Sequence, residues 1–224
     1  MLHNYVHLLA PMLLGAQLIL TLVLVKGDIC PGQRGRVHKA MYFLVAGWAL
    51  AAMNNVLMLL PFALLALFSI KTKTNKTREK GPLPLLYASN VIAAILWGFV
   101  LIKQDTLPAV FFSVVALPLA GAACAHLLLT QARTRLQAFH KILPIVGIIS
   151  GMFMLLVVLW QASLVGEDAL QGAITDILII IASLVLGLVV WAWHLIRQIT
   201  VAKVQLVFST GLVVMSGMLQ LQLF

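Results

Sequence analysis

The sequence predicts an all-α polytopic membrane protein with about eight transmembrane segments. Of its 224 residues, 62% are hydrophobic and only 9% are charged, which leaves too little polar surface for a soluble chain of this length. The apolar residues fall into blocks of about 20, the length that a helix needs to cross a hydrocarbon core of roughly 30 Å. We expect helices rather than strands, because lipid-exposed backbone must satisfy its hydrogen bonds within the segment and strand-like alternation is weak.

Short polar breaks separate the expected segments, and none of them is long enough for a soluble domain. We therefore expect a single membrane domain over residues 1–224. The first segment has no basic residue ahead of it and no clear cleavage site, so we expect it to be retained as a helix. The segments lie at about residues 4–25, 38–53, 56–72, 84–103, 107–131, 142–165, 174–197 and 204–223.

The thirty residues 41–70 carry no formal charge, and basic clusters flank them on both sides. Basic residues next to membrane segments prefer the cytoplasmic side, so this run must leave that side and return to it in a tight hairpin. Asn54 and Asn55 are the expected turn. Each half of the run is short for a crossing at 1.5 Å per residue. The sequence leaves open whether 38–72 is two full spans, a re-entrant pair or one long helix.

The distribution of basic residues sets the expected orientation. With the N-terminus outside, fourteen of the fifteen lysines and arginines fall in inner connections, and only Lys103 falls outside. A single long span over 38–72 would instead split them ten against five. The positive-inside rule therefore favours eight segments with the basic loops in the cytoplasm. We expect a bacterial inner membrane, with anionic lipid headgroups as partners of these loops.

A weak internal similarity predicts a 4+4 parallel repeat with halves 1–105 and 106–224. His-Lys pairs at 38–39 and 140–141 are 102 residues apart, and each precedes an apolar segment that contains glycine. In the second half, Gly-Glu-Asp at 166–168 is the expected outer loop that corresponds to the hairpin turn of the first half. Parallel repeats of this kind occur in membrane transporters.

Four histidines are the candidate cofactor ligands, because the expected topology places them near the cytoplasmic boundary: His38, His126, His140 and His194. Two neutral imidazoles on facing helices can hold b-type haem, one on each side of the iron. His126 and His140 flank one short loop and His194 ends a nearby segment, so pairs are available. The alternative is that these histidines cap helices among lipid headgroups. We assign no metal site and no catalytic residue.

The function that these features favour is a non-catalytic membrane subunit or assembly partner of a respiratory or redox complex, with haem b as its candidate cofactor. Small-residue spacings such as Gly147-x-x-x-Gly151 predict close helix packing, within the chain, with other membrane subunits or with a second copy. Trp160, Trp191 and Trp193 are expected in the interfacial belts. No nucleic-acid motif accompanies the net charge of +9, and no enzyme motif is present.

The alternative function is a small-solute or lipid transporter or channel formed by two four-helix repeats. Its candidate binding groups are Asn54, Asn55 and Asn90. Ion-coupled transport usually needs acids or bases at depth in the membrane, and no Asp, Glu, Lys or Arg falls in the middle of a segment. The sequence therefore argues against a proton-driven pump and leaves a carrier for an apolar or lipid-like solute.

Overall fold

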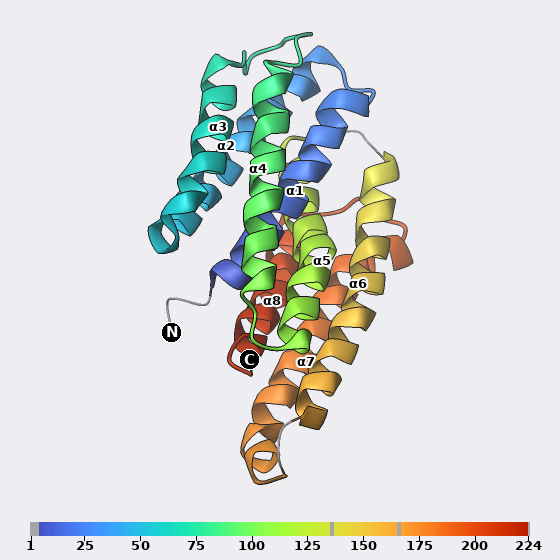
Figure 1. The fold of residues 1–224 in the computed structure, drawn as a ribbon. Coiled ribbons are helices and arrows are strands. Elements are labelled where there is room, and N and C mark those ends of the chain that lie inside the picture. The colour runs from blue at the N-terminus through green and yellow to red at the C-terminus, as the bar shows by residue number, and fades with distance from the viewer. Residues whose placement is uncertain (1–4, 135–136, 165–166, 224) are drawn as a thin grey trace.

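The computed structural model describes residues 5–134, 137–164 and 167–223, without the side chains of 137 and 167–169. Within these residues the chain forms eight α-helices, one 3-10 helix and no strand (Figure 1), which confirms the predicted all-α fold. The elements are α1 (Val6–Lys26), α2 (Pro31–Asn54), η1 (Val56–Met58), α3 (Leu59–Lys71), α4 (Leu83–Ile102), α5 (Leu107–Gln131), α6 (Gln137–Leu164), α7 (Glu167–Ile196) and α8 (Lys203–Gln220). Five of the described helices are long and apolar enough to cross a membrane: α1, α4, α5, α6 and α7.

Helices α2 and α3 form the predicted hairpin. The chain turns at Asn54 and Asn55, and the Asn55 side chain accepts a hydrogen bond from the N–H of Leu57 at 3.1 Å, which caps η1. The hydroxyl of Tyr5 donates to the carbonyl oxygen of Leu50 at 3.1 Å, so the hairpin ends near the level at which α1 begins (Figure 1). The alternative of one long helix through this run is wrong.

Three helices begin earlier than the sequence predicts. Helix α2 begins at Pro31, α6 at Gln137 and α7 at Glu167, because an apolar block marks only the part of a helix that faces lipid. Proline is favoured in a first turn, since its fixed φ suits the helix and its missing N–H would have no partner there. Glu167 and Asp168 therefore belong to α7 and not to an outer loop, and Gly166 lies outside the described residues.

Each half of the chain forms a ring of four helices with the same order of neighbours. Helix α1 packs on α2, α2 on α3, α3 on α4 and α4 on α1, and α5 to α8 follow the same order. One hydrogen bond is also repeated. The Ser89 hydroxyl of α4 donates to the Pro61 carbonyl of α3 at 3.1 Å, and the Ser209 hydroxyl of α8 donates to the Gly187 carbonyl of α7 at 2.9 Å. These observations support the predicted repeat.

The two rings meet chiefly where α1 crosses α5. A Cβ added at Gly15 would overlap the carbonyl oxygen of Leu117, and one at Gly121 would lie 2.7 Å from the Cα of Gly15. Glycines that face each other let two helix backbones approach closely, which is how helices associate where lipid removes the hydrophobic drive. This crossing fixes the position of the second ring against the first.

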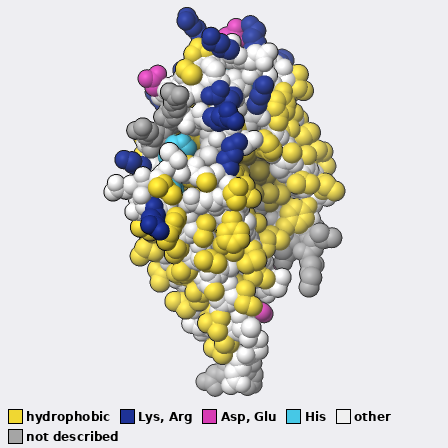
Figure 2. All heavy atoms as spheres, turned by 180° about the vertical axis from the view of Figure 1, so that it is seen from behind, with side chains coloured by type: hydrophobic (Ala, Val, Ile, Leu, Met, Phe, Trp, Pro, Cys, Tyr) yellow, Lys and Arg dark blue, Asp and Glu magenta, His cyan; other side chains and the backbone are white. Residues whose placement is uncertain are grey.

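Lysines and arginines gather at one end of the bundle, which we call the basic end. Figure 2 shows them over the upper part of the molecule, with apolar side chains covering the sides below. The connections between α1 and α2 and between α3 and α4 lie at the top of this end, and the connection between α7 and α8 joins the upper ends of its helices lower down, nearer the middle of the bundle (Figure 1). The basic connections of the first and second halves are therefore on the same side, as a parallel arrangement of the two halves requires.

Candidate functional site

Three of the four predicted histidines form one group at the basic end, which we call the histidine cluster. It consists of His126 on α5, His140 on α6 and His194 on α7. The ring centroid of His126 lies 5.1 Å from that of His140 and 5.6 Å from that of His194. His126 is fully buried, His194 is buried and His140 is half-buried. Packing of α5, α6 and α7 therefore brings together side chains that are far apart in sequence.

A chain of hydrogen bonds runs through the cluster. The indole N–H of Trp191 donates to His126 Nδ1 at 2.8 Å, His126 Nε2 lies 2.9 Å from His140 Nδ1, and His140 Nε2 lies 3.2 Å from the Thr134 carbonyl oxygen. Trp191 packs on Gly147, where an added Cβ would overlap its ring. The expectation that Trp191 lies in an interfacial belt is wrong, since it is only 1% exposed.

His194 makes two contacts of a different kind. Its Nδ1 lies 2.8 Å from the carbonyl oxygen of Trp191, and its Nε2 lies 3.1 Å from the carbonyl oxygen of His140. A carbonyl oxygen only accepts hydrogen bonds, so both contacts are donated together only by a ring that carries a proton on each nitrogen. His194 thus ties the end of α7 to the first turn of α6.

The histidine cluster does not fit a haem as it is arranged. Two imidazole nitrogens that bind one metal ion from opposite sides lie about 4 Å apart, at roughly 2 Å each from the metal. The facing nitrogens of His126 and His140 are 2.9 Å apart, and the other nitrogen of His126 accepts from Trp191. Haem binding stays a prediction that would require these hydrogen bonds to break.

His38, the fourth predicted histidine, lies apart from the cluster in the first half. Its Nε2 is 3.4 Å from the carbonyl oxygen of Glu79, and its ring lies 5.8 Å from that of Phe68. The repeated serine hydrogen bond matches Pro61 of α3 with Gly187 of α7. With this alignment of the two helices, Phe68 corresponds to His194. The pair His38 and Phe68 therefore corresponds to His140 and His194 of the second half.

The first half covers this region with its own chain. The connection between α3 and α4 has eleven residues, 72–82, and the N–H of Thr77 donates to the Pro31 carbonyl at 3.2 Å. Arg34 donates to the Arg78 carbonyl, and a Cβ at Gly35 would overlap the carbonyl oxygen of Asn75. These contacts fold the connection over the end of α2.

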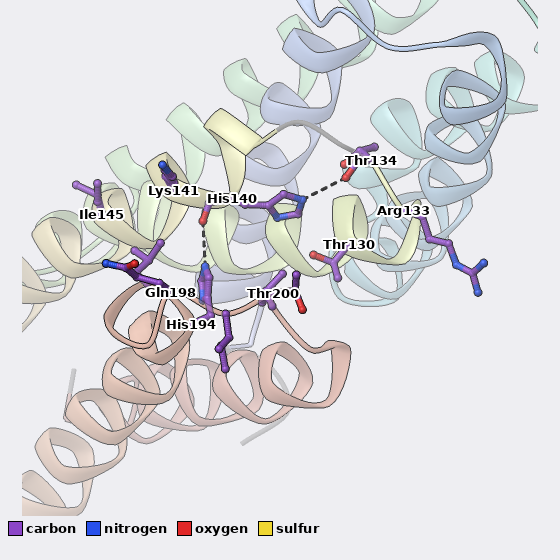
Figure 3. A pocket seen from close by; sticks show the side chains of 12 residues that line it. Thr130, Arg133, Thr134, His140, Lys141, Ile145, His194, Gln198 and Thr200 are labelled. Carbon is purple, nitrogen blue, oxygen red and sulfur yellow. Dashed lines mark hydrogen bonds between the residues drawn. The ribbon is translucent and has the colours of Figure 1, made fainter.

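Among the described residues, the second half leaves the corresponding region open, because the connection between α7 and α8 has only six residues, 197–202. A pocket of about 1000 Å³ lies there between the ends of α5, α6 and α7 (Figure 3), and we call it the groove. It is lined by Thr130, Arg133, Thr134, His140, Lys141, Ile145, His194, Leu195, Gln198, Ile199, Thr200 and Val201.

Two residues of the groove have strained backbones. Arg133 has a φ of 48° and Gln198 a φ of 54°, and among the described residues they are the two non-glycine positions with positive φ. Each follows the end of a helix. The N–H of Thr134 reaches back to the Leu129 carbonyl at 3.2 Å, the bond of a Schellman motif, in which glycine usually holds the left-handed position. Such strain costs about 1–2 kcal/mol and gathers at functional sites.

The charged lining of the groove is entirely basic in the part of the chain that the structure describes. Arg133 and Lys141 lie on opposite sides of its rim with no Asp or Glu among the lining residues. Figure 3 shows His140 and His194 between the helices and the Arg133 side chain pointing away from them. Ile145 and other aliphatic side chains form the rest of the wall. The groove therefore offers cationic groups and an apolar surface side by side.

The asparagines of the alternative site do not come together. Asn90 lies within α4 and its amide is engaged at both ends: the oxygen accepts from Gln17 Nε2 at 2.7 Å, and the nitrogen donates to the Thr21 hydroxyl at 3.0 Å. Asn54 and Asn55 lie at the hairpin turn instead. Asn90 thus belongs to a structural network, and the turn is a separate feature.

The groove residues other than its histidines were not predicted from the sequence. Arg133, Lys141 and Gln198 appeared only as loop charges or polar breaks. One signal was present in the sequence, since the second of the two comparable connections is much shorter, 197–202 against 72–82. Nothing in the sequence marked the strained backbone, because neither strained position is a glycine.

Comparison with known proteins gives a family and one partial relative. A family model described as an integral membrane domain matches residues 3–221. A protein of Haemophilus influenzae strain Rd, described as an uncharacterized protein, is 33% identical over 147 residues, which are 60% of this chain and 54% of the relative. The chain thus spans about half the length of the curated relative that it matches. No solved structure matches this chain.

Proposed function

Since the chain belongs to this family of integral membrane domains, we propose that it is a membrane carrier for an anionic, lipid-like solute that binds in the groove. The proposal rests on one observation, an open pocket of about 1000 Å³ that is lined by Arg133 and Lys141 together with two histidines. Pockets that hold small molecules have volumes of about 300–1,000 Å³ and combine apolar walls with a few placed polar groups.

A phosphate group attached to an apolar tail matches the chemistry of this lining. Arg133 and Lys141 supply charge-assisted hydrogen bonds to phosphate oxygens, and Thr130 adds a hydroxyl. Ile145 and Leu195 supply an apolar surface for the tail. A free phosphate would use the first set of groups only, so the presence of both sets favours an amphiphile.

The first half offers an internal indication of the same preference. There, the region that corresponds to the groove is filled by the connection 72–82, which presents carbonyl oxygens to the basic side chains. His38 lies against the carbonyl of Glu79, and Arg34 donates to the carbonyl of Arg78. In the first half, backbone carbonyl oxygens thus contact the basic side chains of this region. A ligand with several acceptor oxygens suits the basic side chains of the second half in the same way.

We place the basic end on the cytoplasmic side of a bacterial inner membrane, with the N-terminus outside. The basic connections of both halves lie on one side of the bundle, and the positive-inside rule assigns that side to the cytoplasm. The groove then lies at the level of the inner headgroups, where lipids with a phosphate group and acyl tails are present.

The function of a redox-complex subunit has less support. The small-residue spacing that suggested it is used inside the chain, because Gly147 and Gly151 face Trp191 and Leu188 of α7. The haem part of that hypothesis is tested by an absorbance spectrum of the purified protein. A Soret band that His126→Ala removes would revive it, and the subunits that co-purify would then identify the complex.

Binding tests the proposal first. The probe is dihexanoyl phosphatidylglycerol, added to the full chain in an uncharged detergent, with dihexanoyl phosphatidylcholine and glycerol phosphate as comparisons. We expect the anionic lipid to bind most tightly. Arg133→Gln and Lys141→Gln should each weaken its binding by roughly tenfold or more, since a hydrogen bond to a charged group contributes about 1.5–3 kcal/mol. Lys73→Gln is the matched control, because Lys73 pairs with Glu79 at the same end but outside the groove.

Equal binding of the anionic and zwitterionic lipids would contradict the proposal, as would unchanged binding in the Arg133→Gln, Lys141→Gln double variant. Tight binding of glycerol phosphate would assign the groove to a free phosphate compound instead. Carrier activity needs a second assay, the transfer of a fluorescent phosphatidylglycerol between the leaflets of proteoliposomes. We expect transfer that the double variant slows and Lys73→Gln does not.

A further inference from the structure

The hydrogen bonds of the histidine cluster have a fixed direction. An indole N–H is only a donor, so His126 Nδ1, at 2.8 Å from Trp191 Nε1, accepts. A neutral His126 then carries its proton on Nε2 and donates it to His140 Nδ1 at 2.9 Å. His140 in turn carries its proton on Nε2 and donates it to the Thr134 carbonyl oxygen at 3.2 Å. Both rings are neutral in this arrangement, and every ring nitrogen has a partner.

An added proton must break one of these bonds. Only two nitrogens of the pair accept, Nδ1 of His126 and Nδ1 of His140, and a proton on either would point at a neighbouring N–H across 2.8 or 2.9 Å. His126 is fully buried, whereas His140 is half-buried and lines the groove. The imidazolium form is therefore accommodated at His140, whose ring can turn into the groove once its bond to His126 is lost.

The charged and titratable groups that face His140 are all cationic or neutral. His126 comes from α5, Arg133 follows the end of α5, His194 comes from α7, and Lys141 follows His140 on α6. Among the described residues, no carboxylate lines the groove. A negative charge close to an imidazole favours its protonated form. An anionic phosphate in the groove offsets these charges and favours the imidazolium form.

We propose that His140 couples the binding of an anion in the groove to the uptake of one proton. The proton comes from the solvent in the groove and adds to His140 Nδ1, and the hydrogen bond from His126 Nε2 to that atom breaks. The imidazolium then donates to the anion. This inference rests on the proposed function, because it concerns the same groove. By linkage the anion binds more tightly as the pH falls, by up to about tenfold per pH unit for one fully coupled proton.

Calorimetry of the full chain in an uncharged detergent tests the coupling. Dihexanoyl phosphatidylglycerol is the probe, because its phosphodiester keeps one negative charge from mildly acidic to neutral pH. Titrations in two buffers of different ionisation enthalpy give the number of protons taken up. We expect uptake in the wild-type protein and none in His140→Asn, which should still bind, with an affinity that no longer changes with pH. His38→Asn, the first-half counterpart outside the groove, should keep the uptake.

Binding without proton uptake in the wild-type protein would overturn the inference and leave the proposed function standing. Equal uptake in His140→Asn would do the same. Absence of binding at every pH would overturn both. A ligand-free measurement guards against a misfolded variant: the indole N–H resonance of Trp191, assigned with Trp191→Phe, should shift on acidification in the wild-type protein and stay in place in His140→Asn.

Discussion

Replacing Gln17 with leucine should destabilise the first half strongly, although the change makes the helix more apolar. Gln17 lies within α1 and is fully buried. Its Nε2 donates to Asn90 Oδ1 at 2.7 Å and to the Ser89 hydroxyl at 3.0 Å, and its Oε1 accepts from Trp48 Nε1 at 2.7 Å. One side chain thus links α1 to α2 and α4 through three hydrogen bonds.

The magnitude follows from these bonds. A side-chain hydrogen bond between membrane helices contributes about 0.6 kcal/mol on average, so three contribute about 2 kcal/mol. The substitution also leaves the indole N–H of Trp48, a fully buried residue, without its acceptor, and an unsatisfied buried donor costs a further 1–3 kcal/mol or so. We expect Gln17→Leu to lower the free energy of unfolding by roughly 3–5 kcal/mol.

The assay is equilibrium unfolding in mixed detergent micelles, with Gln220→Leu as the matched control. Gln220 is equally buried near the end of α8, but neither of its side-chain polar atoms has a hydrogen-bond partner among the described residues. Removing an unpartnered buried amide should leave the free energy of unfolding unchanged or raise it, by up to about 1–3 kcal/mol on mutational scales. A Gln17→Leu protein as stable as the wild type, or equal losses in both variants, would refute this account of the network.

Three further predictions concern the helix crossing, the groove and the topology. Gly15→Ala should lower the free energy of unfolding by about 1–3 kcal/mol, the usual cost of overpacking, because its Cβ would overlap the Leu117 carbonyl oxygen. Gly98→Ala, which has open space around it in α4, should leave the free energy of unfolding unchanged or raise it by up to about 1 kcal/mol, since alanine is the better helix former. The same unfolding assay measures both variants. Gln198→Gly should relieve the strain of a φ of 54° and raise the midpoint of thermal unfolding, with a gain in the free energy of unfolding of up to about 1 kcal/mol. The same variant should weaken phosphatidylglycerol binding if the amide contacts the ligand. A lower midpoint would contradict the assigned strain. In a background with both native cysteines replaced by serine, Asn55→Cys should react with an impermeant thiol reagent added outside the cell and Lys76→Cys should not; the reverse pattern would invert the proposed orientation.

The hairpin shows what charge patterns can predict. Neither hydropathy nor length distinguishes one crossing from two in residues 41–70, but basic clusters on both sides require the chain to return. Asn54 and Asn55 are the polar residues near the middle of that run, and the structure places the turn there. The prediction succeeded because the deciding interaction, the side preference of lysine and arginine, is a property of the linear sequence.

Histidine grouping was predictable only in part. His126 and His140 flank a short connection, so the sequence alone indicates that they lie close together. Their chemistry depends on Trp191, whose ring lies on Gly147 and whose N–H sets the direction of the hydrogen bonds. That partner comes from α7, and the sequence assigned it to a lipid interface. The direction of the hydrogen bonds between the histidines therefore depends on a tertiary contact, and no local sequence pattern predicts that contact.

The difference between the halves lies in a connection rather than in the helices. Both halves have the same order of helix neighbours and the same serine bond between their third and fourth helices. His38 of α2 and His140 of α6 occupy corresponding positions. The eleven-residue connection 72–82 covers His38, whereas the six-residue connection 197–202 leaves His140 exposed to the groove. The strained positions lie only beside the open one in the described chain. The lengths of the two connections, eleven residues against six, thus account for why this region is filled in the first half and forms a groove in the second.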